Sequence, residues 1–261
     1  MTSHKAETIR INGCDTEFLR GGKGPTLLFL HGAGGINGWA PYLDALAQGY
    51  DVIAPSHPGF GRSEDPDWLD SVSDIAFFYL DLMESLELRD VHLVGNSLGG
   101  WIASEIVIRS DEKIKSLTLA SAAGINVVGV PMGDIFMWSN EEAARKIFYD
   151  QEIANQRIAA GETMDEEQKD VQLKNYFTTG KLSWNPRFHN PDLSKWLHRI
   201  KVPTMIIWGE NDEIFPTAYG EAYNALIPGS ELRIIPECGH LPHQEKLEEF
   251  LDAVNSNTSK N

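Results

Sequence analysis

Gly95-Asn96-Ser97-Leu98-Gly99 is a Gly-x-Ser-x-Gly pentapeptide near the middle of this chain. The residues just before it, Val91-His92-Leu93-Val94, predict a short buried strand, and the apolar residues of 100–110 predict a helix just after it. A serine between a strand and a helix is forced into a sharp, strained turn that lifts its hydroxyl out of the chain. A glycine two residues away on each side leaves room where a side chain would collide with the neighbouring strand and helix. The pentapeptide therefore predicts that Ser97 is a nucleophile.

Two backbone N–H groups are expected to form an oxyanion hole beside this serine. Leu98 opens the predicted helix, so its N–H has no partner within the helix and can face a negative charge. The second donor is expected in the loop after the predicted strand 26–30, His31-Gly32-Ala33-Gly34-Gly35, whose small residues let the backbone approach a substrate closely. We expect this donor to be Ala33, with Gly34 as the alternative.

A histidine is needed to take the proton of the serine hydroxyl, and an acid is needed to orient that histidine. Of the eight histidines, His240 lies in a loop between the last predicted strand and the last predicted helix. This loop is at the carboxyl edge of the predicted sheet, the same edge from which Ser97 emerges. We therefore predict that His240 is the base; His243, three residues on, is the alternative.

The orienting acid is expected in the loop after the predicted strand 204–208, which contains Glu210, Asp212 and Glu213. Asp212 is favoured because a glycine three residues before it and a proline four residues after it shape the loop that presents it. The loop after the predicted strand 114–120 begins without an acid. The predicted catalytic residues therefore follow one another along the chain as nucleophile, acid and histidine.

Short apolar stretches alternate with helical patterns along most of the chain. The predicted strands are residues 7–12, 15–20, 26–30, 51–55, 91–94, 114–120, 204–208 and 231–235. The predicted helices that accompany them are residues 41–48, 74–86, 100–110, 219–226 and 246–254. Strands that alternate with helices indicate an α/β fold with a mostly parallel sheet covered by helices on both faces.

The alternation stops between about residues 122 and 199. This stretch is rich in charged residues and predicts helices over 140–156 and 164–178 but no strand. We interpret it as a helical cap inserted over the strand ends, with residues 1–121 and 200–261 as the core domain. The alternative is that it forms another face of a single domain.

Composition limits the partners of the protein. The 261 residues are 42% hydrophobic, enough for one large core or a core domain with an insertion. With 22 Lys and Arg against 38 Asp and Glu, the net charge is −16, which repels nucleic acid and anionic membrane surfaces. We expect a small-molecule substrate, no metal and no nucleotide cofactor, since no metal-ligand or phosphate-loop motif is present. The chain has no signal peptide or membrane-spanning run, so we expect it in the cytoplasm.

Taken together, the chain resembles the α/β-hydrolase superfamily over nearly its whole length. Besides the pentapeptide, the motifs that carry the resemblance are His31-Gly32, His57-Pro58-Gly59-Phe60-Gly61-Arg62-Ser63, Trp208-Gly209-Glu210-Asn211-Asp212 and Gly239-His240. The resemblance implies an eight-stranded, mostly parallel sheet, a helical cap from about 122 to 199 and no cofactor. It also supports the order Ser97, Asp212, His240.

Within this superfamily we expect a serine hydrolase that cleaves an ester of a small or medium substrate. The alternative is a carbon–carbon bond hydrolase of ring-fission products, because Asn96-Ser97-Leu98-Gly99-Gly100 is similar to the elbow of that subgroup and Arg187 could hold a substrate carboxylate. That subgroup commonly has tryptophan after the catalytic histidine, where this chain has Leu241, and Arg187 has a salt bridge to an acid as its alternative role.

Further alternatives concern the cap and the reaction itself. Trp184 and Phe136 are expected to line the pocket or to form the core of the cap. Haloperoxidase-like and hydroxynitrile lyase activities use the same triad. A non-enzymatic receptor that kept the fold is the alternative from another functional class.

Overall fold

The structure is a computed structural model that describes residues 2–259. In these residues eight strands form one sheet in the order β1-β2-β4-β3-β5-β6-β7-β8. The strands are β1 (His4–Ile11), β2 (Cys14–Gly22), β3 (Thr26–Leu30), β4 (Asp51–Pro55), β5 (Val91–Asn96), β6 (Ile114–Ala120), β7 (Thr204–Gly209) and β8 (Glu231–Ile235). β2 pairs antiparallel with β1 and β4, and the other neighbours are parallel. The predicted eight-stranded, mostly parallel sheet is therefore confirmed.

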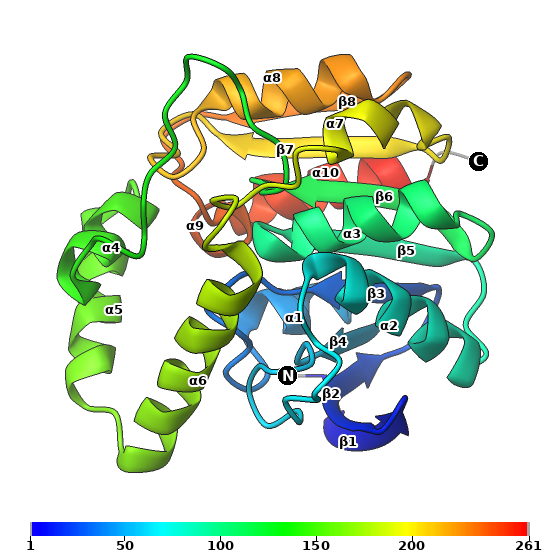
Figure 1. Ribbon diagram of the computed structural model, residues 1–261, viewed down its shortest axis with the longest axis horizontal. Helices are drawn as coiled ribbons and strands as arrows, with labels where there is room; N and C mark the ends of the chain where they lie inside the picture. Colours follow the sequence, from blue (N-terminus) through cyan, green and yellow to red (C-terminus); the bar gives the residue numbers. More distant parts are fainter. Residues whose placement is uncertain (1, 260–261) are drawn as a thin grey trace.

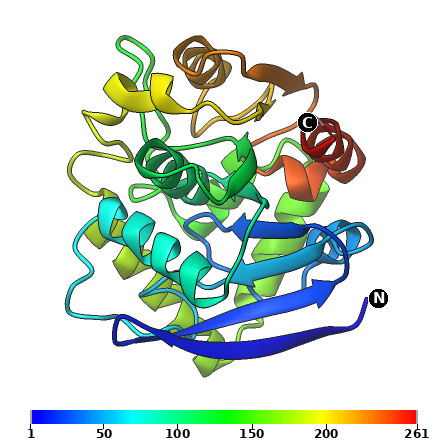
Figure 2. The same ribbon diagram turned by 90° about the vertical axis from the view of Figure 1, so that its right-hand side faces the viewer.

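Helices cover both faces of this sheet (Figures 1 and 2). On one face lie α2 (Val72–Ser85), α3 (Leu98–Arg109) and α8 (Thr217–Leu226), and on the other lie α1 (Pro41–Leu46) and α10 (Leu247–Thr258). One face of α2 is apolar and buried, including Ile75, Phe78 and Leu82. Burial of each such side chain stabilises the fold by roughly 1.5–3 kcal/mol. The core thus consists of two apolar layers, one on each face of the sheet.

The loops at the carboxyl edge of the sheet are linked to one another by backbone hydrogen bonds. Ser97 N–H donates to Ala120 O (2.9 Å), and Ser121 N–H donates to Ile207 O (2.9 Å). Between the loops that follow β7 and β8, the Asn211 N–H donates to Cys238 O (2.8 Å). Neighbouring parallel strands end at the same edge, so these bonds bring loops that are distant in sequence into one row.

The chain between β6 and β7 is helical. Its elements are α4 (Asn140–Ile147), α5 (Gln151–Glu162), α6 (Glu166–Ser183), α7 (Leu193–Trp196) and a 3₁₀ turn (Leu197–Arg199). Helices α4, α5 and α6 lie beyond the carboxyl ends of the strands (Figure 1). We refer to residues 122–199 as the cap segment. A further short helix, α9 (Pro242–Glu245), follows β8.

The single helix predicted over residues 140–156 is wrong, because the chain leaves the helical conformation between α4 and α5. Phe148 is extended (φ −108°, ψ 132°) and caps the end of α4. Asp150 then starts α5, since its side chain accepts a hydrogen bond from Glu152 N–H (2.8 Å). Sequence periodicity missed this break because both halves are helical.

Among the helices of residues 2–259, none is both long and apolar enough to cross a bilayer.

Candidate active site

Ser97 occupies the strained turn that the pentapeptide predicts. It lies between β5 and α3 with φ 53° and ψ −115°, a conformation that costs a non-glycine residue roughly 1–3 kcal/mol. A Cβ on Gly95 would lie 2.3 Å from Gly99 O, and one on Gly99 would lie 2.1 Å from Leu30 O. Both glycines are therefore required by contacts between backbones.

The structure joins Asp212 to His240. His240 Nδ1 and Asp212 Oδ2 are 2.8 Å apart, and both side chains are buried. The other carboxylate oxygen, Oδ1, accepts the N–H groups of Ile214 and Phe215, each at 2.9 Å. The carboxylate is thus held by its own loop and receives the Nδ1 proton of the imidazole. His240 Nε2 is then the nitrogen that can accept a proton.

Ser97 lies at the same edge of the sheet but is not hydrogen-bonded to the histidine. Within residues 2–259 its hydroxyl makes no hydrogen bond of 3.5 Å or less. Catalytic hydrogen bonds are often long before substrate binds and shorten only in the reacting complex. The structure therefore forms one link of the predicted triad, and the Ser97–His240 link stays a prediction.

His243, the alternative base, has a different environment. Its ring packs among Phe29, Tyr42 and Phe250, with the Tyr42 ring centroid at 4.6 Å. Burial, and then the neighbouring His240, lower its pKa from 6.5 to about 3. The acid of the 210–213 loop bonds to His240 instead, so His243 lacks an orienting partner of this kind.

The predicted oxyanion loop lies against the nucleophile. A Cβ on Gly32 would come within 3.2 Å of Ser97 Cβ. Gly35 N–H donates to Gly32 O (3.0 Å), which makes Ala33 and Gly34 the central residues of a tight turn. Leu98 is the first residue of α3 and has no carbonyl one turn earlier to accept its N–H. Their role as oxyanion donors stays a prediction.

Two stacked histidines, His31 and His57, hold this loop in place by hydrogen bonds. The rings of His31 and His57 lie 3.7 Å apart between centroids. His31 Nε2 accepts the His57 N–H (3.1 Å), so its Nδ1 carries the proton and donates to Gly32 O (2.7 Å). His57 Nε2 donates to His31 O (2.9 Å) and its Nδ1 accepts from the Tyr79 hydroxyl (2.5 Å). Both rings are neutral and every ring nitrogen is used in a hydrogen bond, which gives His31 and His57 a structural role.

These neutral histidines predict a loss of stability in acid. Burial lowers the pKa of His31 from 6.5 to about 4, that of His243 to about 3 and that of His57 well below 6.5. Between pH 6.5 and 4 the unfolded chain binds protons that the folded chain cannot, so the free energy of unfolding falls as the pH falls. For His31 and His243 the loss is on the order of 3 to 5 kcal/mol each once the pH is below the folded pKa.

Urea unfolding between pH 8 and pH 4.5 measures this effect. We expect a constant free energy of unfolding above about pH 7.5 and a steep decline below 6.5. His243→Phe should reduce the slope, whereas His198→Gln, at an exposed position, should leave it unchanged. A free energy of unfolding that is equal at pH 8 and pH 5 would contradict the assignment of neutral, buried rings.

Arg187, Phe136 and Trp184, the three predicted substrate contacts, form one cluster on the cap segment. Arg187 Nη1 donates to Asp134 Oδ1 (3.0 Å), which is the salt bridge left open as its alternative role. Its guanidinium lies 4.1 Å from the centroid of Trp184 and 5.0 Å from that of Phe136. Cation–π contacts and an ion pair thus hold the group in place. Trp184 is 55% exposed, so it does not belong to a buried cap core.

An aromatic path connects this cluster to the histidine. Phe136 stacks on Phe188 with centroids 5.1 Å apart, Phe188 meets Phe215 at 6.3 Å, and Phe215 meets His240 at 5.6 Å. Phe188 and Phe215 are buried. These two phenylalanines were not predicted as site residues; Phe215 could have been found from its place in the acid loop, three residues after Asp212.

Sequence analysis also missed the residues that fasten the cap segment to the site. His240 N–H donates to the carbonyl of Ile147, the last residue of α4 (2.7 Å). The Glu245 carboxylate accepts the N–H groups of Gly239 (2.9 Å), in its own loop, and of Tyr149 (2.9 Å), in the cap segment. The contacts to Ile147 and Tyr149 join backbone groups of the cap segment to residues more than ninety positions away, and no side-chain pattern predicts them.

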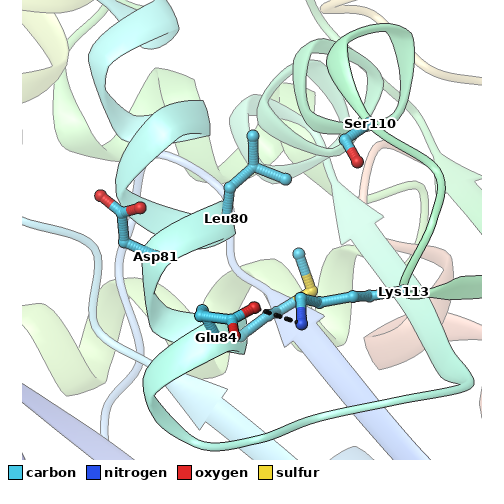
Figure 3. A pocket seen from close by; sticks show the side chains of 6 residues that line it. Leu80, Asp81, Glu84, Ser110 and Lys113 are labelled. Atoms are coloured by element: carbon cyan, nitrogen blue, oxygen red, sulfur yellow. Dashed lines mark ion pairs between the residues drawn. The ribbon is translucent and has the colours of Figure 1, made fainter.

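Two further features of residues 2–259 bear on where a site can lie. In residues 2–259, no three His, Cys, Asp or Glu side chains are grouped so that they could hold a metal ion. A shallow pocket of about 240 Å³ lies beside α2, and its lining includes Ser110 and Lys113 from the amino side of β6 (Figure 3). There Glu84 and Lys113 form an ion pair (2.5 Å). This pocket is at the opposite end of the strands from Ser97.

The sequence profile of the α/β-hydrolase fold matches residues 25–247, which include the elbow, the acid loop and the histidine loop. The chain belongs to the α/β-hydrolase family. This membership agrees with the sheet order and with the strained serine turn described above.

Relatives and solved structures show what the chain is similar to. It is 29% identical over 86% of its length to a 2-hydroxy-6-oxononadienedioate/2-hydroxy-6-oxononatrienedioate hydrolase of Paraburkholderia phymatum, covering 84% of that protein. It is 25% identical over 92% of its length to the dihydrolipoyllysine-residue acetyltransferase component of an acetoin cleaving system of Cupriavidus necator, of which it spans 65%. A crystal structure of a meta-cleavage product hydrolase superposes with a TM-score of 0.78 at 23% identity, with 98% of each chain covered.

Proposed function

We propose that this α/β hydrolase works as a serine hydrolase through a covalent acyl-enzyme. His240 Nε2 takes the proton of Ser97 as its hydroxyl oxygen attacks a carbonyl carbon, and the N–H groups of Leu98 and Ala33 hold the resulting oxyanion. The observation that carries the proposal is the Asp212–His240 hydrogen bond at the edge where the strained Ser97 emerges. This bond supports the tautomer that leaves Nε2 free for the proton.

We further propose that the bond cleaved is a carbon–carbon bond; this is the first of two candidate reactions. Seven relatives at 26–29% identity are named as 2-hydroxy-6-oxo-dienoate or 2-hydroxy-6-oxononadienedioate hydrolases. After Ser97 attacks the 6-oxo carbon of such a substrate, the carbon–carbon bond next to it breaks and the departing carbon keeps the electron pair. The 2-hydroxy enol must first become a ketone, because conjugation can then delocalise this pair onto the ketone oxygen. The protonated His240 then gives its proton to the leaving group, and water releases the acyl group from Ser97.

Ester hydrolysis is the second candidate, and two observations favour it. Arg187, the cation expected to bind a dienoate carboxylate, already pairs with Asp134. Leu241 stands after the histidine where the carbon–carbon hydrolases commonly have tryptophan. An ester makes fewer demands on the site, because an alkoxide leaves without the need for conjugation.

Turnover of two substrates separates the candidates. We expect kcat/KM for 2-hydroxy-6-oxo-6-phenylhexa-2,4-dienoate to exceed that for 4-nitrophenyl butyrate by at least about tenfold. The reverse order would make the protein an ester hydrolase. Turnover of neither compound, together with no labelling of Ser97 by a fluorophosphonate, would contradict the proposal of a serine hydrolase and favour a non-enzymatic protein.

Arg187→Met then tests how the anionic substrate is held. Asp134 occupies one of the five N–H groups of the guanidinium, so others remain for a carboxylate. We expect KM for the dienoate to rise about tenfold with little change for the neutral ester, as for loss of one charge-assisted contact. Arg145→Met, which removes an exposed cap arginine paired with Glu141, is the matched control.

A further inference from the structure

One buried amide connects the cap segment to the predicted oxyanion loop. Asn175, on α6, is 5% exposed. Its Nδ2 donates to Gly34 O (3.1 Å), and its Oδ1 accepts the N–H of Gly61 (2.8 Å). Both ends of the amide are therefore used by backbone groups of two different core loops, more than a hundred residues away in sequence.

The loop is shaped to receive this amide. Gly35 has φ +76°, a conformation that favours glycine, and a Cβ there would lie 2.4 Å from Asn175 Nδ2. Any side chain at this position would displace the amide or the loop. The close approach thus depends on residues from both the core and the cap segment.

The contact reaches the oxyanion donor through the peptide planes of the turn. Asn175 holds the carbonyl of the Gly34–Gly35 peptide, and the N–H of the same peptide donates to Gly32 O (3.0 Å). Because a trans peptide is planar, the direction of the Gly32 carbonyl sets the direction of the Ala33 N–H on its other side. One side-chain amide therefore influences where the predicted oxyanion donor points.

We propose that Asn175 is a positioning residue for the reaction: through the Gly34 carbonyl, helix α6 of the cap segment sets the orientation of the Ala33 N–H in the oxyanion hole. This inference rests on the proposed serine hydrolase function. It assigns Asn175 no contact with substrate.

Other contacts keep α6 attached to the core when Asn175 is changed. The Thr178 hydroxyl donates to Gly59 O (2.7 Å), and Lys174 Nζ donates to Gly61 O (3.2 Å). At the two ends of the helix, Glu167 pairs with Arg62 and Lys181 pairs with Asp65. All of these partners belong to the turn at residues 59–65, not to the oxyanion loop. Loss of the Asn175 amide should therefore release the Gly34 carbonyl while the helix stays docked; the long hydrogen bond from the Thr179 hydroxyl to Ala33 O (3.4 Å) then remains between α6 and the loop.

The matched pair Asn175→Asp and Thr178→Val tests the proposal. Asn175→Asp keeps the shape and the acceptor for Gly61 N–H but places an oxygen against Gly34 O. Thr178→Val removes a buried hydrogen bond of the same helix to the other turn. We expect Asn175→Asp to lower kcat at pH 8 at least about tenfold with KM within about threefold, as when an interaction of the transition state alone is weakened. Thr178→Val should keep kcat within about twofold of the wild type, even if its melting temperature falls as much as that of Asn175→Asp.

The outcomes separate this inference from the proposed function. Wild-type turnover with an unchanged kcat in folded Asn175→Asp overturns the role of Asn175 alone, as does an equal loss of kcat in Thr178→Val. Asn175→Ala, which removes both bonds without adding charge, is the second variant, and failure of both to fold overturns the positioning role in favour of a structural one. Absence of wild-type turnover and of Ser97 labelling overturns the proposed function itself.

Discussion

Ser97→Ala is expected to lower kcat by roughly 10⁴- to 10⁶-fold, as for loss of the nucleophile in other serine hydrolases. The physical reason is that an alanine methyl cannot form the acyl-enzyme. Stability should hardly change, because alanine keeps the Cβ in the strained turn and the Ser97 hydroxyl has no hydrogen bond in residues 2–259 to lose. Turnover of the dienoate or the ester, with melting temperatures within about 3 °C, checks both parts.

Ser121→Ala is the matched control for this variant. Ser121 follows β6, the strand beside β5, and also has a positive φ, 45°. Its hydroxyl is buried and, in the part of the chain that the structure describes, has no hydrogen-bond partner. We expect activity within about twofold and equal or greater stability, because a buried, unpaired hydroxyl is unfavourable. If Ser97→Ala loses no more activity than Ser121→Ala, Ser97 is not the nucleophile.

Asp212→Asn should reduce kcat by about 10⁴-fold through the tautomer of the histidine. The backbone N–H groups of Ile214 and Phe215 require an acceptor at the Oδ1 position, so the asparagine must place its oxygen there. Its NH₂ group then faces His240 Nδ1, which becomes an acceptor, and the ring proton moves to Nε2. A protonated Nε2 cannot take the proton of Ser97.

The measurement for this variant combines kinetics with the state of the ring. We expect the loss in kcat together with a neutral imidazole protonated on Nε2 in nitrogen NMR. Glu213→Gln is the control, because Glu213 is the neighbouring acid and forms only an exposed ion pair with Lys146 (2.9 Å); we expect its activity within about twofold. An Asp212→Asn variant that is as active as Glu213→Gln would remove Asp212 from the mechanism.

The contrast between these two acids shows what sequence could predict. Glu210, Asp212 and Glu213 share one loop, and the shape of that loop favoured Asp212. The structure supplies the reason: Asp212 alone of the three is buried, and its carboxylate is satisfied by two backbone N–H groups and one imidazole. Glu213 points to a lysine at the surface.

The cap segment was less predictable. Its helical character followed from the absence of strand patterns, but the break at Phe148–Asp150 did not, because both halves have helical patterns; beside this break Ile147 O accepts the His240 N–H. The polar residues Asn175, Thr178 and Thr179 recur at one face of α6, and that spacing is the signal that could have marked the face as buried. The spacing does not predict which loops these residues contact.

By itself, the sequence determined the local features: the strained turn at Ser97, the order of strands and helices, and the loops that carry Asp212 and His240. These depend on sterics and periodicity within about ten residues, and parallel strands bring their carboxyl ends together without further information. The tertiary structure was needed to show that Arg187 pairs with Asp134, that Glu245 binds the Tyr149 N–H of the cap segment and that Asn175 reaches Gly34 O. Each of these is a contact between distant segments. Most of them involve backbone atoms, which are the same in every residue, so composition and residue spacing do not predict them.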